Sequence, residues 1–84
     1  MPRTIYKYPL TLQRSQVVTL PRVHKILTVQ AQGQRPMLWA MVNTDSVSEQ
    51  LRIYCLPTGE EGPPPEWDYI ATIQVDWTVW HFFS

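Results

Sequence analysis

The sequence predicts an all-β protein, with about seven short, mainly antiparallel strands in a small sandwich or open barrel. Eight prolines divide its 84 residues into segments too short for ordinary helices, because proline removes a backbone donor and clashes inside a helix. Between the prolines the segments are rich in Val, Ile, Thr, Tyr and Trp, which suit a pleated, half-buried surface. A chain of this length fits one domain, so we expect residues 1–84 to fold as a single unit.

The β-rich segments place strands at residues 4–12, 16–21, 25–32, 37–43, 49–56, 69–75 and 78–83. In two of these strands hydrophobic and polar residues alternate, and side chains on a strand point to opposite faces with period two. The alternation therefore places two sets of residues on core-facing sides: Leu27, Val29 and Ala31 in the third strand, and Tyr69, Ala71, Ile73 and Val75 in the sixth.

The segment 37–43 shows no such alternation, which is typical of a strand covered on both faces. We expect Leu38, Ala40 and Val42 at the centre of the core. Just before this strand, Gly33 and its polar neighbours predict a hairpin turn between the third and fourth strands.

The segment 57–68 is the one long irregular stretch, with four prolines, two of the three glycines and four acidic residues. Three consecutive prolines favour a stiff, extended conformation. We expect this loop to close one end of the β-structure, although the same composition is found in segments that present a recognition motif.

Residue types limit the chemistry of the chain. Cys55 is the only cysteine, so we expect no disulfide and a small buried side chain in a reducing compartment. No recognised spacing of metal ligands occurs, and we expect neither a metal nor a cofactor. No apolar run approaches the roughly 20 residues of a membrane span, so no membrane partner is expected.

The charges are distributed unevenly, although they sum to zero. Residues 1–44 hold six Lys or Arg and no acid, whereas residues 45–84 hold seven Asp or Glu and one Arg. If the strands of residues 1–44 pair with one another, the molecule has a basic face formed by them and an acidic face formed by residues 45–84. Strands of the two halves that pair together would instead cancel the charges locally.

Catalytic machinery is not evident, and we expect no enzyme. Nucleophilic catalysis needs a nucleophile, a base and a group that orients the base, and the chain has two histidines. His81 lies in the aromatic run WTVWHFF, where a structural role is expected. The carboxylates crowd a loop that should be solvated, and no glycine-rich phosphate-binding motif occurs.

A set of aromatic and basic residues remains as the candidate ligand site. Rings beside cations are used to bind nucleotides, because the ring stacks on the base and the cation meets a phosphate. A net charge of zero argues against duplex nucleic acid as the partner, and a small anionic ligand or a protein surface fits better. The candidate residues are Tyr6, Lys7, Tyr8, Arg22, Lys25, Arg52 and Tyr54, with Trp39 as a further aromatic.

The last strand predicts self-association. If Trp80, Phe82 and Phe83 exceed what so small a core can hold, they form an exposed apolar patch, and such a patch usually marks an interface. We therefore expect a homo-oligomer, most simply a twofold dimer.

Several segments resemble small β-proteins encoded by bacteriophages and prophages. The resemblance lies in RTIYKYPL at the start, KILTVQAQGQRPMLWAMV at 25–42, TG at 58–59, YIATIQ at 69–74 and VWHFF at 79–83. It implies an accessory protein that acts in the bacterial cytoplasm during infection and counters host defence by stoichiometric binding.

Three modes of action are compatible with this context. The first is sequestration of a nucleotide-derived immune signal, such as a cyclic nucleotide or an ADP-ribose derivative, in pockets that an oligomer forms between its subunits. The basic and aromatic residues of the N-terminal half favour this mode. The second is masking of a host defence protein, for example a nuclease or CRISPR effector, by the acidic face. The third is a minor virion or assembly component whose C-terminal strand pairs with another subunit.

Overall fold

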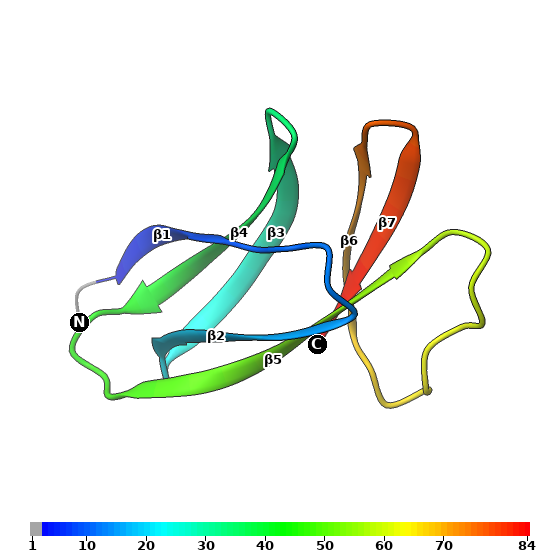
Figure 1. The fold of residues 1–84 in the computed structure, drawn as a ribbon. Coiled ribbons are helices and arrows are strands. Elements are labelled where there is room, and N and C mark those ends of the chain that lie inside the picture. Colours follow the sequence, from blue (N-terminus) through cyan, green and yellow to red (C-terminus); the bar gives the residue numbers. More distant parts are fainter. Residues whose placement is uncertain (1–2) are drawn as a thin grey trace.

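A computed structural model describes residues 3–84, which form seven strands and no helix (Figure 1). The strands are β1 (Arg3–Pro9), β2 (Ser15–Pro21), β3 (His24–Gln32), β4 (Arg35–Asn43), β5 (Ser48–Pro57), β6 (Tyr69–Val75) and β7 (Thr78–Phe83). The all-β prediction is confirmed, and the largest boundary difference is that β1 ends at Pro9. Consistent with this all-strand structure, no helix within residues 3–84 could cross a membrane.

The strands form two antiparallel sheets rather than a closed barrel. The three-stranded sheet has the order β1-β4-β3, and the four-stranded sheet has the order β2-β5-β7-β6. The sheets pack as a flat sandwich, 16 Å thick along its shortest axis, in which β3 lies along β6 (Figure 1). The chain crosses between the sheets several times, so β2 joins a sheet whose other strands all come from the C-terminal half.

Two hairpin turns meet at one end of the molecule (Figure 1). The predicted turn between β3 and β4 is confirmed: Gly33 has a φ of 65°, a conformation that glycine adopts without a steric penalty. Asp76 adopts a φ of 55° in the β6–β7 turn. Its backbone N–H donates to the side-chain oxygen of Gln34 at 2.9 Å, which ties the two turns together.

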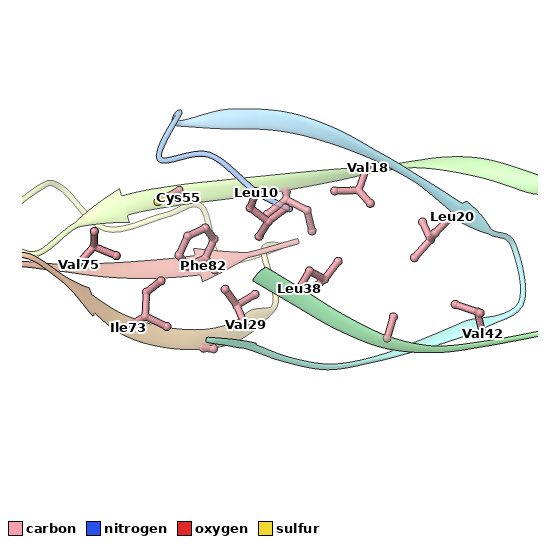
Figure 2. Close-up of a cluster of buried hydrophobic side chains, with 13 residues drawn as sticks. Leu10, Val18, Leu20, Val29, Leu38, Val42, Cys55, Ile73, Val75 and Phe82 are labelled. Atoms are coloured by element: carbon pink, nitrogen blue, oxygen red, sulfur yellow. The ribbon is translucent and has the colours of Figure 1, made fainter. Parts of the chain in front are cut away.

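The core lies between the sheets and draws on strands from both (Figure 2). Leu38, Ala40 and Val42 are buried to 1% exposure or less, as predicted. The opposite face of β4, which carries Trp39, is only half-buried, so the prediction of a strand covered on both faces is wrong. The described residues form only two layers, so no third layer packs on the outward face of the sheet that contains β4.

Two bulges change the predicted core faces. The β3–β4 register shifts between Ile26 and Thr28, so Leu27 is left out of the ladder and is 41% exposed while Ile26 packs on the core. Val29 and Ala31 keep their predicted side. A second shift follows Tyr69, which is 62% exposed instead of facing the core with the rest of β6.

The last strand is not an exposed interface. Phe82 is fully buried at the centre of the core (Figure 2). Trp80 is partly buried and packs against the same cluster. Of the three predicted contact residues, Phe83 alone lies on the outer face of its sheet, where it packs in tilted and edge-to-face contacts with other aromatic rings. Because β7 lies between β5 and β6, it has no free edge with which to pair with another subunit. The predicted interface is therefore wrong, whereas self-association stays a prediction.

Cys55 is a buried core residue on β5, as predicted. Burial raises the pKa of its thiol to about 11, because the thiolate is poorly solvated in an apolar core. We expect the folded protein to resist iodoacetamide at pH 8 and the unfolded protein to be alkylated once, as measured by mass spectrometry. Rapid alkylation of the folded protein would contradict this burial.

A candidate anion-binding surface on the three-stranded sheet

The charge asymmetry of the sequence becomes a surface in the structure. All three strands of the three-stranded sheet come from residues 3–43, the part of the chain without acids. The outer surface of this sheet, which we call the cationic face, carries four cations around a strip of apolar side chains. The cations are Arg3, Lys7, Lys25 and Arg35, and the apolar residues are Ile5, Met37, Trp39 and Met41.

Strand register fixes this arrangement. Residues directly opposite each other in a ladder point to the same side, and Met41 lies between Ile5 on β1 and Lys25 on β3. Lys7 lies opposite Trp39 in the same way. The buried residues of β4 alternate with these, so the cations point away from the core.

The cations of this face have no carboxylate partner among residues 3–84. The one ion pair of the described residues joins Arg14 to Glu60, in loops outside this sheet. The Lys7 ammonium group donates a hydrogen bond to the side chain of Gln32 at 2.9 Å, which leaves its charge uncompensated. The face therefore presents a positive potential to solvent despite the net charge of zero.

A pocket of about 240 Å³ lies at one end of the cationic face. It is formed by the start of β1, the β2–β3 turn, the start of β3 and the end of β4. The residues that line it are Arg3, Val23, His24, Lys25, Met41, Val42 and Asn43.

Hydrogen bonds hold the rim of this pocket in place. The backbone N–H of Asn43 donates to the carbonyl of Val23 at 2.9 Å, and that of Val23 donates to Ser46 Oγ at 3.1 Å. His24 Nδ1 lies 2.8 Å from the carbonyl oxygen of Pro21. A carbonyl can only accept, so the proton of neutral His24 is on Nδ1 and Nε2 remains an acceptor. The pocket is thus largely preformed, which lowers the entropic cost of binding.

The pocket combines two cations with an apolar floor. Arg3 and Lys25 supply donors for phosphate or carboxylate oxygens, and arginine can bind such groups with two parallel hydrogen bonds. Val23, which is 56% exposed, and Met41 offer apolar surface beside them. Trp39 follows on the same side of β4, roughly 7 Å from Met41 along the strand. The arrangement fits an anion attached to a flat ring.

The structure divides the predicted ligand residues among several places. Lys25 lines the pocket, Lys7 lies on the same face, and Arg22 directly precedes Val23 in the β2–β3 turn. The remaining four predicted residues lie elsewhere: Tyr6 and Tyr8 point to the other side of β1, and Arg52 and Tyr54 lie on the outer face of the four-stranded sheet.

The predicted set does not form one pocket within a single chain, because the core separates the two sheets. Arg52 donates to Ser15 Oγ at 3.1 Å, and Tyr54 stacks on Trp67 with ring centroids 3.7 Å apart. These side chains thus have partners of their own on the opposite surface.

Of the seven residues that line the pocket, only Lys25 was in the predicted ligand set, so Arg3, His24 and Met41 are among the six that the sequence analysis missed. Arg3 alternates with Ile5 and Lys7, which is a weak indication that they share a face. Its place beside Lys25, however, depends on β4 lying between β1 and β3, and no local pattern encodes that strand order.

A second pocket, of about 200 Å³, lies between the 58–63 segment and β7, and it is acidic. His81 is in its wall, and both ring nitrogens have hydroxyl partners: Nε2 lies 2.7 Å from Thr58 Oγ1 and Nδ1 lies 3.0 Å from Thr72 Oγ1. The Tyr69 hydroxyl, 2.7 Å from Thr72 Oγ1, extends this network. Glu60 and Glu61 also line the pocket.

The Thr58–His81 distance resembles that of a nucleophile and its base, but the surroundings do not fit acyl transfer. The group behind His81 is a hydroxyl, which stabilises an imidazolium far less than a carboxylate does. Glu60 and Glu61 would repel a developing oxyanion in the pocket. The network links the residue that directly follows β5 to β6 and β7 across the outer face of the sheet, which suits the structural role expected for His81.

Residues 3–84 contain no group of three His, Cys, Asp or Glu residues placed to hold a metal ion. The whole chain, residues 1–84, matches a family described as Domain of unknown function (DUF7352). Comparison with curated proteins and with solved structures gave no match. Since the match spans the full length, the chain belongs to the DUF7352 family.

Proposed function

We propose that the protein is a non-enzymatic binding protein that holds a nucleotide-type anion on its cationic face. In the setting implied by the resemblance to phage proteins, it would sequester a nucleotide-derived immune signal in the bacterial cytoplasm. The observation that carries this proposal is the pocket between Arg3 and Lys25, in a sheet whose strands contain cations and no acid.

The size of the pocket suggests how such a ligand would sit. Small-molecule sites usually enclose about 300–1,000 Å³, so a pocket of about 240 Å³ takes only part of a nucleotide. We place the phosphate between Arg3 and Lys25 and the base along the strip formed by Met41 and Trp39. A base stacked on an aromatic ring contributes about 1–3 kcal/mol.

Calorimetric titration tests this site with a cyclic dinucleotide and with ADP-ribose as probes. We expect R3E and K25E each to weaken binding at least about tenfold, since each replaces a charge-assisted hydrogen bond by repulsion. R52E is the matched control: it makes the same charge change on the opposite surface, and its affinity should stay within about twofold of the unmodified protein.

Native mass spectrometry of protein purified from bacteria that produce these signals gives an independent test. Extra mass that is released on denaturation and absorbs near 260 nm would support sequestration. A ligand-free protein that also fails to bind both probes would overturn the proposal. If R52E and K25E lose the same amount of binding affinity, the ligand binds somewhere other than the pocket between Arg3 and Lys25.

One observation favours masking of a host protein as a second candidate function. Glu61, Glu66 and Asp68 are exposed on the loop before β6, and none forms an ion pair among residues 3–84. They offer an acidic surface to a cationic partner. Co-purification of a basic host protein, lost when the three residues are changed to Gln or Asn, would support this function over anion binding.

A further inference from the structure

The outer strand β2 has backbone groups that point away from its sheet, and the hydrogen bonds at its two ends show which ones. At one end the backbone N–H of Cys55 donates to the carbonyl of Arg14 at 3.0 Å, and at the other that of Arg22 donates to the carbonyl of Val47 at 2.7 Å. Both bonds continue the β2–β5 register. Because such bonds recur at every second residue, Ser15, Val17 and Thr19 direct their N–H and C=O groups to the free edge.

This edge is unusual because β2 itself carries no charged side chain to protect it. Residues 15–21 contain no charged side chain, and Val17 is 42% exposed. The other edges of the described sheets differ: β1 carries Arg3 and Lys7, while β3 and β6 lie along each other. Proteins commonly protect exposed edges with charges, proline or a covering segment, because an open strand pairs readily with another strand.

We propose that a second copy of the chain occupies this edge, with the two β2 strands antiparallel about a twofold axis at Val17. Side chains directly opposite each other must share a face, which requires residues of the same parity. Val17 then lies opposite Val17 of the partner subunit, and Ser15 lies opposite Thr19 of the partner subunit. All three free N–H groups of each strand would donate across the junction.

A second copy is the occupant because the edge is complementary to itself. The small hydroxyl and β-branched side chains make favourable cross-strand pairs, and no like charges oppose each other. The edge of β1 lacks this property: a symmetric pair about Ile5 would set Arg3 opposite Lys7 of the partner subunit, and opposed like charges destabilise a sheet.

The dimer has a consequence for binding that goes beyond the proposed function. A twofold axis perpendicular to the joined four-stranded sheets leaves both three-stranded sheets on the same side. The two cationic faces would then point in one direction and form a bivalent surface, on which a ligand with two anionic ends could gain affinity by avidity.

Light scattering after size-exclusion chromatography tests the junction through its mass. We expect the unmodified protein to approach twice the chain mass of 9.9 kDa as its concentration rises, and V17K to remain at the mass of one chain. V47K is the matched control, since Val47 is 70% exposed in the β4–β5 turn, opposite Arg22 and beyond the three residues whose N–H groups point to the free edge. It should associate like the unmodified protein.

A second variant covers the case in which V17K fails to fold. T19P removes an N–H that points to solvent in the single chain, and proline is tolerated on such edges. T19P should therefore keep a folded circular dichroism spectrum and lose the dimer mass. A single-chain mass for the unmodified protein at all concentrations, or a dimer mass for folded V17K or T19P, would overturn the proposal.

Amide hydrogen exchange identifies the edge directly. The Val17 and Thr19 amides of the unmodified protein should become protected as its concentration rises, because they are exposed in the single chain and bonded in the dimer. A dimer in which these amides exchange as fast as in V17K would place the junction elsewhere and refute the assignment.

Discussion

Replacing Phe82 with alanine should lower the free energy of unfolding by about 3–5 kcal/mol, the range for large aromatic side chains in a core. Phe82 is fully buried on the central strand β7, with side chains of both sheets around it (Figure 2). An 84-residue chain has roughly 4–13 kcal/mol of stability in total, so F82A should lose a large fraction of that stability. Urea denaturation followed by circular dichroism measures the loss.

The adjacent residue provides the control for this prediction. Phe83 is half-buried on the outer face, and F83A should cost about 1–2 kcal/mol because part of its surface is already exposed to water. If F83A costs as much as F82A, the inward direction of Phe82 is wrong. A stable F82A that loses only self-association would restore the interface predicted from the sequence.

The strands themselves were predictable because their local determinants agree. Prolines and glycines end the segments, and β-branched and aromatic residues fill them, so turn chemistry and strand propensity point to the same boundaries. In β4, the continuous apolar run 37–43 correctly placed Leu38, Ala40 and Val42 in the core, but it gave no sign that the face with Trp39 is only half-buried. The turn at Gly33 was predictable for a similar reason, since glycine adopts a positive φ readily.

The bulges were not predictable from alternation. One extra residue reverses the faces on either side of it, and Ile26 and Leu27 are equally apolar, so the sequence gives no reason to choose between them. The structure settles the choice by burying Ile26 and exposing Leu27. Tyr69 differs in the same way, since the shift that follows it turns its ring to the outer surface.

Strand order explains why the candidate site was only partly predicted. The cationic face needs β1, β4 and β3 side by side, and these strands are separated along the chain by β2. Lys25 was identified by residue type alone, whereas its partner Arg3 becomes visible only through the β1–β4 register. Arg52 and Tyr54 were grouped with them because a sequence does not show which sheet a strand joins.

The position of the last strand, β7, within its sheet was also not predictable from the sequence. An aromatic run at the end of a chain suggests an exposed edge strand, yet β7 lies between β5 and β6. Its position creates room for aromatic side chains on both faces: Phe82 fills the core, while Phe83 joins the rings outside. The excess of aromatic residues that seemed to require a partner subunit is thus taken up within the chain.

Replacing Trp67 with alanine should lower the free energy of unfolding by about 2–3 kcal/mol and release the 58–68 loop. The Trp67 ring stacks on Tyr54 with an interplanar angle of 8° and lies 6.1 Å from the Phe83 ring. These contacts hold the loop against the outer face of the four-stranded sheet. The loop therefore covers part of this face, in addition to closing one end of the fold. Proteolysis within 59–66 should become at least about tenfold faster in W67A, because local opening of the loop then occurs more often than unfolding of the whole domain.

Trp77 supplies the matched control, because it is the same residue type with 96% exposure in the β6–β7 turn. W77A should leave both stability and loop cleavage unchanged. Two further contacts would still hold the loop in W67A: the reciprocal backbone hydrogen bonds between Asp68 and Ser84, at 2.8 and 2.9 Å, and the Arg14–Glu60 ion pair. Cleavage should therefore concentrate between these anchors, at Glu61 to Glu66. Equal cleavage of W67A and the unmodified protein would mean that the ends of the loop, rather than the aromatic stack, keep it in place.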